Sequence, residues 1–214
     1  MPQHPVVTDE LLAAALGPEP KPDPSARSPR FFHRGLWESL TRAHPASPYL
    51  LHLPLVAASL WLARPLAPLS LLLLLAAGAL AWTFVEYWLH RGFFHMRADT
   101  PARRVTSYVV HRHHHAAPHD PARIAATPAY SLGLLLLLFA VYSLAGPHAR
   151  FALLAGTSLG YLAYEATHWQ IHHARPRTRL GRAVHRHHLR HHADGRANFG
   201  ISSPLWDLVF RTRR

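Results

Sequence analysis

Histidine is the residue type best suited to chemistry in this sequence, which holds 20 histidines and no cysteine in 214 residues. Sixteen of the histidines lie between positions 90 and 192, most of them in four short clusters. Imidazole nitrogen is a ligand for iron, zinc, copper and nickel. Because ten imidazoles exceed what one ion can use, the sequence predicts a dinuclear metal site. Its ten candidate ligands are His90, His95, His111, His114, His115, His168, His172, His188, His191 and His192.

Helical spacing brings most of these ligands together within each cluster. Residues three or four apart share one face of an α-helix. The second cluster, 111–115, and the fourth, 188–192, each place their three ligands within an arc of about 100°. In the third cluster, 168–172, the two ligands are one turn apart. His90 and His95 lie about 140° apart on an ideal helix, so they need a bend or reach different ions.

Other histidines receive different predictions. His113 and His173 each point about 140° or more away from the first ligand of their cluster, so we expect them beside the site or on the surface. His185 and His187 offer the fourth cluster a second register, and their roles stay open. A histidine-rich tract can also be an unspecific metal-binding or pH-sensitive surface. The isolated histidines, expected to be structural or solvated, are His4, His33, His44, His52 and His148.

Composition removes several classes of protein and narrows the partners. Without cysteine there is no disulfide scaffold, thiolate zinc site, cysteine-bound iron–sulfur cluster or cysteine nucleophile. The net charge of +12 fits nucleic acid, an anionic membrane or an acidic substrate. The long apolar segments favour a membrane, because basic residues beside such segments are attracted to anionic lipid headgroups. We therefore expect no nucleic-acid partner.

Four apolar segments must position the histidine clusters, and they predict an all-α integral membrane protein. They cover roughly 49–63, 66–89, 128–146 and 151–167, which gives about four transmembrane helices in two hairpins. The first is short for a hydrocarbon core of about 30 Å, so whether it crosses completely stays open.

Two hairpins place the N-terminal stretch, residues 90–127 and the chain after 167 on one side of the membrane. That side carries 21 of the 23 Lys and Arg residues, and the other carries only Arg64 and Arg150. Positive charge concentrates on the cytoplasmic side. We therefore predict that both termini and a helical, histidine-rich cap holding the metal site are cytoplasmic.

The chain divides into a flexible, proline-rich tail over 1–30 and a membrane-embedded domain over 31–214. Within the tail, Thr8 can cap a short helix that ends near Leu16, and no secretory signal is recognisable. Residues 31–43 predict either a helix in the membrane interface or an amphipathic helix packed on the cytoplasmic cap. The apolar face of that helix consists of Phe32, Leu36, Trp37 and Leu40.

The histidine clusters resemble the motifs of the fatty acid hydroxylase/sterol desaturase superfamily, and within it most closely the fatty acid 2-hydroxylases lacking a cytochrome b5 domain. Residues 114–123 are similar to that group's His-His-x-x-Pro-x-Asp-x-x-Arg. Residues 164–168 resemble its Tyr-Asp-x-x-His, with Glu165 in place of Asp. Residues 199–212 resemble its closing signature. The resemblance covers roughly 31–212.

This resemblance implies an O2-dependent oxidoreductase, a membrane-bound monooxygenase that hydroxylates a lipid acyl chain at carbon 2. It also implies two iron ions held by the ten histidines, with zinc as a redox-inactive substitute. Electrons are expected from a separate protein: a cytochrome b5-like protein, a ferredoxin or a reductase. The alternatives are a sterol or carotenoid hydroxylase or a desaturase with the same histidine centre, and a membrane metal-binding protein without enzymatic activity.

Acidic side chains are expected to orient the ligating rings by hydrogen bonds. The candidates are Glu86, Asp120, Glu165 and Asp207, and Glu86 is the most informative because an acid near the end of a span needs a partner. For Asp120 and Asp207, helix capping or a turn is an equal alternative. The substrate-binding residues stay unknown, and the aromatic side chains that can line an acyl slot are Trp82, Phe84, Trp88, Phe93, Phe94 and Trp169.

Overall fold

The computed structural model describes residues 4–18 and 21–214, and these residues are built from helices and loops with one isolated β-bridge. The α-helices are α1 (Asp9–Leu16), α2 (Gly35–Ser39), α3 (Ser47–Ala63), α4 (Pro68–Trp88), α5 (Pro101–Ser107), α6 (His113–Ala116), α7 (Pro128–Tyr142), α8 (Ala149–His173), α9 (Arg179–Asp194) and α10 (Leu205–Val209). Two π-helical turns, η1 (Leu89–Phe94) and η2 (Tyr108–Arg112), and a 3₁₀ turn, η3 (Ser143–Ala145), extend or join them.

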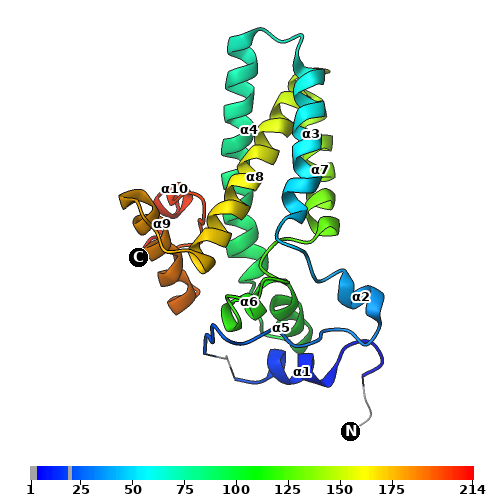
Figure 1. The fold of residues 1–214 in the computed structure, drawn as a ribbon, viewed down its shortest axis with the longest axis vertical. Coiled ribbons are helices and arrows are strands. Elements are labelled where there is room, and N and C mark those ends of the chain that lie inside the picture. The colour runs from blue at the N-terminus through cyan, green and yellow to red at the C-terminus, as the bar shows by residue number, and fades with distance from the viewer. Residues whose placement is uncertain (1–3, 19–20) are drawn as a thin grey trace.

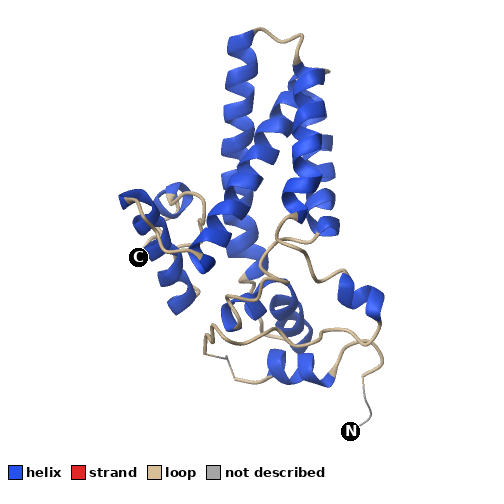
Figure 2. Ribbon diagram, in the orientation of Figure 1, coloured by secondary structure: helices blue, strands red, loops and turns tan. Residues whose placement is uncertain are grey.

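Four long helices form an elongated bundle, and the shorter helices gather toward one end of it (Figures 1 and 2). Helix α8 is central, because it packs against α3, α4 and α7. Two stretches are long and apolar enough to cross a membrane, namely Pro68–Phe94 and Pro128–Ala145, and Ser47–Ala63 is a shorter apolar helix. The prediction of an all-helical fold with membrane-length apolar helices is confirmed.

Glycines let α4 and α8 approach closely at the centre of the bundle. A Cβ atom at Gly156 would lie 2.1 Å from the carbonyl oxygen of Leu75, and one at Gly78 would lie 2.3 Å from that of Leu153. Thr157 adds a hydrogen bond of 3.1 Å from its hydroxyl to the Gly78 carbonyl. Small residues and a polar tie at such a crossing are typical of helices that associate in lipid. The crossing fixes the position of α8, whose last turns carry two candidate ligands.

The described part of the predicted tail is packed rather than loose. Thr8 accepts a hydrogen bond of 3.1 Å from the Leu11 amide, so the predicted cap is confirmed, and α1 ends at Leu16 as expected. Leu11 is fully buried against α5, together with Phe31 and Tyr108. The tail is packed because α1 has a small apolar face that contacts α5, almost a hundred residues later in the chain.

The predicted helix over 31–43 is much shorter in the structure, where α2 covers only Gly35–Ser39. Glu38 is responsible, because its carboxylate accepts hydrogen bonds from the Phe31 and Phe32 amides, at 2.8 and 3.1 Å, and so holds the preceding chain extended. Leu36 and Trp37 are 71% and 51% exposed. The apolar face of α2 therefore points outward and is not packed on the rest of the protein.

The close α4–α8 crossing predicts a steric response to a single methyl group. We expect Gly156→Ala to destabilise the protein by about 1–3 kcal/mol, because the new Cβ overlaps the Leu75 carbonyl. In thermal unfolding of the detergent-purified protein, this corresponds to a Tm lower by roughly 3–10 °C. Gly133→Ala on α7 is the matched control, since nothing lies within 4 Å of a Cβ there. Equal Tm values for the two variants would show that the crossing is looser than described.

Candidate metal centre

A π-helical turn at the end of α4 brings His90 and His95 to the same face, although they are five residues apart. The His95 amide donates to the carbonyl of His90, five residues earlier, at 3.0 Å. This wider turn brings His90 and His95 to one face, with ring centroids 5.1 Å apart. The expectation that they are separated by about 140° holds only for an α-helix, and here the bend is built into η1. A second π turn, η2, precedes α6 and orients His111 in the same way.

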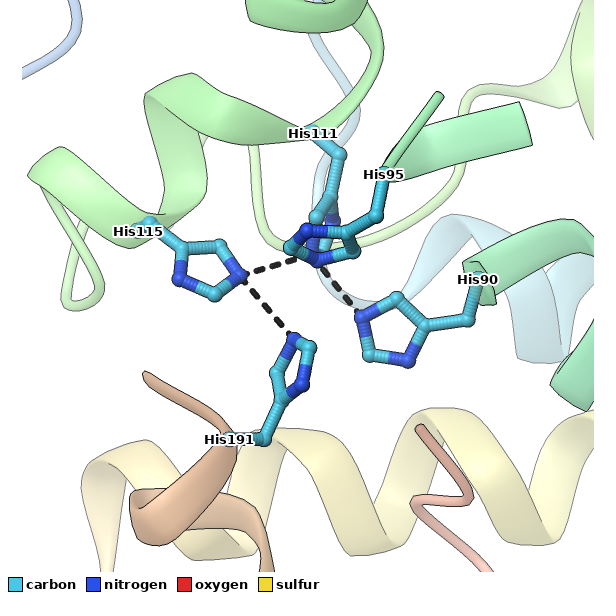
Figure 3. Close-up of side chains that lie close together, drawn as sticks. All are labelled: His90, His95, His111, His115 and His191. Carbon is cyan, nitrogen blue, oxygen red and sulfur yellow. Dashed lines mark hydrogen bonds between the residues drawn. The ribbon is translucent and has the colours of Figure 1, made fainter. Parts of the chain in front are cut away.

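Five histidines from four segments of the chain form the first group. Figure 3 shows their rings converging on a common point. The Nε2 atoms of His90 and His111 are 3.0 Å apart, as are those of His111 and His115. The Nε2 atoms of His115 and His191 are 3.2 Å apart. One nitrogen from each ring lies within 4.8 Å of all the others in this group, which consists of His90, His95, His111, His115 and His191.

The second group lies directly beside the first. Its Nε2 atoms are equally close, at 2.9 Å between His172 and His188 and 3.0 Å between His188 and His192. His168 joins the group through an Nε2–Nε2 distance of 2.9 Å to His114. The mutually close nitrogens belong to His114, His172, His188 and His192. All ten histidines selected from the sequence are thus brought together.

Two helical clusters are divided between the groups. Near α6, His111 and His115 face the first group and His114 the second; on α9, His191 faces the first group and His188 the second. Adjacent residues on a helix point about 100° apart, so a single turn can supply both groups when they lie side by side. Spacing places the three ligands of each cluster on one helix face, but the structure divides these three ligands between the two groups.

The first group fits a cation better than it fits hydrogen bonds among its own rings. His90 Nδ1 donates to the Phe199 carbonyl at 2.5 Å, and His191 Nδ1 donates to the Ala197 carbonyl at 2.8 Å. Each neutral ring then directs the lone pair of its Nε2 inward. His111 Nε2 carries at most one proton, which cannot serve both of its neighbours at 3.0 Å. Two ligands of one ion, each about 2.1 Å from it, lie about 3 Å apart at a right angle.

Burial keeps these imidazoles in the neutral form that binds metal. Removal from water, followed by the charge of His191, lowers the pKa of His95 to about 3. Burial likewise lowers the pKa of His191 to about 4. At neutral pH both rings are therefore uncharged, which is the form of histidine that binds a metal ion.

The candidate acids reach the rings through the backbone. Glu86 accepts hydrogen bonds from the amides of Ile201 and Ser202, at 2.5 and 2.9 Å. Asp207 accepts from the amides of Phe199 and Gly200, at 2.9 and 2.8 Å. Together the two carboxylates clamp residues 199–202, whose Phe199 carbonyl holds the His90 ring. This differs from the expectation of direct bonds to ligating rings.

The other two acids hold loops. Asp120 accepts from the Ser28 and Ala122 amides, at 3.0 and 3.2 Å, which matches the alternative of a turn residue. Glu165 accepts from the Ala126 amide at 3.1 Å. Both acids therefore stabilise the segment between α6 and α7, and neither is placed against a ligating ring by a described hydrogen bond.

The remaining clustered histidines lie outside both groups. His113 is buried, with Nδ1 2.8 Å from the Tyr108 carbonyl, so it supports the π turn rather than lying at the surface. His173 is exposed and stacks on Trp169 at a centroid distance of 3.8 Å. His187 lies 3.2 Å from Asp207, and His185 belongs to neither group.

Sequence reasoning missed a buried ion pair beside the site. Arg123 donates from Nη2 to Glu38 at 2.6 Å and from Nη1 to the Thr41 carbonyl at 3.0 Å. Its guanidinium also lies over the ring of Phe31, 3.6 Å from the centroid. Burial lowers the pKa of Arg123 to about 10, so it stays charged. The available signal was its place in the motif over 114–123.

An apolar cavity of about 190 Å³ reaches both groups of histidines. His111 from the first group and His114 and His168 from the second form part of its wall. The rest is mainly apolar or aromatic, including Leu40, Val109, Ile124, Phe94 and Tyr130. Among the aromatic residues suggested from the sequence, Phe94 lines this cavity and Trp82 lines the adjoining space beside His90. Trp169 lines a different cavity, and the side chains that are substantially exposed are Phe84, Trp88 and Phe93.

Known proteins share this arrangement of sequence and fold. The profile described as fatty acid hydroxylase matches residues 75–212. The dihydroceramide fatty acyl 2-hydroxylase FAH2 of Arabidopsis thaliana is 35% identical over 188 residues, which cover 86% of this chain and 79% of that protein. The fatty acid 2-hydroxylase of Mus musculus is 31% identical over 216 residues, covering 88% of this chain and 58% of that protein.

A solved structure agrees with these relatives. The structure titled "Full length scs7p (only hydroxylase domain visible)" superposes with a TM-score of 0.77 at 27% identity, over 84% of this chain and 70% of that chain. Profile, sequence relatives and fold agree with the resemblance carried by the histidine motifs. This chain belongs to the fatty acid hydroxylase family, a family of oxygen-dependent enzymes.

Proposed function

We propose that this chain is a membrane-bound monooxygenase that hydroxylates carbon 2 of a lipid acyl chain. The observation that carries the proposal is the pair of adjoining histidine groups at the wall of an apolar cavity. Relatives named as dihydroceramide and fatty acid 2-hydroxylases support the acyl chain and the position. The balanced reaction joins R–H, O2, two electrons and two protons to give R–OH and water.

The ten histidines are the proposed ligands of two iron ions, five rings to each group when His168 is counted with the second. Iron supplies the redox chemistry for O2 activation that side chains lack. Zinc can occupy the same imidazoles but has no redox chemistry. The protein's own contribution is to hold ten neutral rings in place.

The cavity walls position the substrate. Apolar side chains from Leu40 just after α2, from η1, from η2 and from the loop before α7 favour a hydrocarbon chain over water. His111, His114 and His168 share that wall, so the substrate carbon lies next to both groups. Hydrophobic contact holds the hydrocarbon, and the polar groups of the same wall, including the charged Arg123, are available to fix its orientation.

For the membrane arrangement we propose four spans in two hairpins, formed by α3, α4, α7 and α8, with the histidine groups in a cytoplasmic cap. His148 Nδ1 lies 3.0 Å from the Leu62 carbonyl, so the start of α8 lies beside the end of α3. Arg64 and Arg150 therefore share the end of the bundle opposite the histidines (Figure 1). The other 21 Lys and Arg residues belong to the segments proposed to be cytoplasmic.

Lipid analysis tests the reaction. In cells expressing the wild type we expect a 2-hydroxy acyl product in hydrolysed lipids, identified by mass-spectrometric fragmentation. His172→Ala removes a buried nitrogen of the second group, and we expect it to lower product at least about 100-fold. His173→Ala, next to it but exposed, is the matched control and retains the product. Hydroxylated sterol or carotenoid, or a desaturated chain, would point to the other reactions of this histidine scheme.

Metal analysis tests the ligand set. We expect two iron ions per wild-type chain by plasma mass spectrometry of protein purified with iron supplied. His191→Ala and His188→Ala remove one ligand from different groups, so each loses at least one ion per chain. His173→Ala keeps both ions. Wild-type protein with one ion or none would refute the dinuclear assignment.

The carboxylate clamp gives a separate prediction. Asp207→Asn weakens the hold on the Phe199 and Gly200 amides, and we expect metal affinity to fall about 10–100-fold because the His90 ring loses its fixed acceptor. Competition with a chelator measures this affinity. Asp120→Asn, which affects a loop away from residues 199–202, keeps wild-type affinity. A clamp that is only structural would give the same affinity in both variants.

A further inference from the structure

Three of the ten histidines differ from the others in exposure. Seven are buried, whereas His95, His115 and His192 are partly exposed. These three rings line one open cleft of about 740 Å³. His95 and His115 belong to the first group and His192 to the second. Each group therefore has at least one histidine ring that is partly exposed in this cleft.

The rim of this cleft is positively charged. Its basic side chains come from four separate segments: Lys21, Arg97, Arg112 and Arg196. The carboxylate at the rim, Asp194, is already engaged by Arg214 at 2.6 Å. The Arg97 side chain is 88% exposed and lies 3.7 Å from Asp99, a carboxylate that Arg103 also engages at 2.8 Å. The net field at the mouth of the cleft thus favours an acidic partner.

The cleft and the apolar cavity are different openings onto one site. They share no lining residue, and different histidines line each of them. Among the described residues, those that line the cleft include no Leu, Ile, Val, Phe or Trp, and its apolar members are Pro22, Met96, Ala98 and Ala193. The lipid side and the aqueous side of the centre are therefore chemically distinct.

We propose that the cleft, hereafter the basic cleft, docks a small acidic one-electron carrier protein. The inference rests on the proposed function, since a monooxygenase needs two electrons in each turnover. Each docked carrier is oxidised by one electron, which enters through the exposed ring edges of His95, His115 or His192. Two dockings and two protons from water complete the reduction of one oxygen atom of O2 to water. The partner is recognised by charge, which speeds encounter and sets orientation.

Binding of a defined carrier tests the proposal without turnover. The purified chain in neutral nanodiscs is probed with the acidic haem domain of cytochrome b5 and with an acidic [2Fe–2S] ferredoxin, and Kd is measured by biolayer interferometry at low and physiological ionic strength. We expect at least one carrier to bind, with Kd raised at least about tenfold by Arg97→Glu combined with Arg196→Glu. Unchanged iron content and elution volume show that this double variant is folded.

A second double variant tests whether binding depends on the charges of the basic cleft or only on the total charge of the protein. Arg175→Glu combined with Arg177→Glu makes the same charge change on exposed residues at the other end of α9, about 24 Å along the helix. We expect it to raise Kd less than about threefold. Equal weakening by both double variants, or no binding of either carrier, overturns the proposal.

Lipid headgroups are the competing occupant. Vesicles of phosphatidylserine in place of the carrier should bind equally to both double variants. If only the Arg97 and Arg196 variant loses vesicle binding while carrier binding is unchanged, the cleft holds headgroups and the proposal is wrong. Because Kd is measured without substrate, failure here leaves the lipid analysis of the wild type unaffected, and failure of that analysis leaves the docking result standing.

Discussion

The structure depends on one constraint: ten imidazole rings face inward, and neighbouring Nε2 atoms lie about 3 Å apart with too few protons to share. Such an arrangement repels itself unless cations lie among the rings or the surrounding protein holds them rigidly. The carbonyls of Phe199 and Ala197 fix His90 and His191 from behind. Glu86 and Asp207 in turn fix the segment that carries Phe199. The carboxylates therefore hold the backbone segment in place, and the backbone carbonyls in turn hold the histidine rings in place.

The helical bundle supplies the rigidity that this centre needs. Helix α8 is held against α4 by a glycine contact that leaves no room for a side chain. It then continues beyond the bundle to present His168 and His172 to the second group. Helix α4 does the same for the first group through its π turn. The two longest helices thus connect the apolar half of the molecule to the histidine half.

The sequence was sufficient to predict the helical class, the apolar segments and the ten histidines that the structure brings together, because imidazoles at helical spacing are a local pattern. It could not predict the π turns, which add one residue to a turn and depend on contacts such as His113 with the Tyr108 carbonyl. Nor could it reveal the carbonyl of Phe199, since any residue has a carbonyl. The packing of Leu11 against α5 was equally hidden, because one helical turn of apolar residues is too short to indicate its partner.

The division of α9 between the two groups has a thermodynamic consequence. His191 and His188 stand on one rigid helix but serve different groups. An ion at either group fixes the rotation and the axial position of α9, and therefore prepays part of the ordering cost for the other ion. If both groups bind the proposed ions, their occupancy would be linked, with the second ion bound more tightly than the first. Such cooperative loading disfavours the half-filled state, in which one metal would be present without its partner.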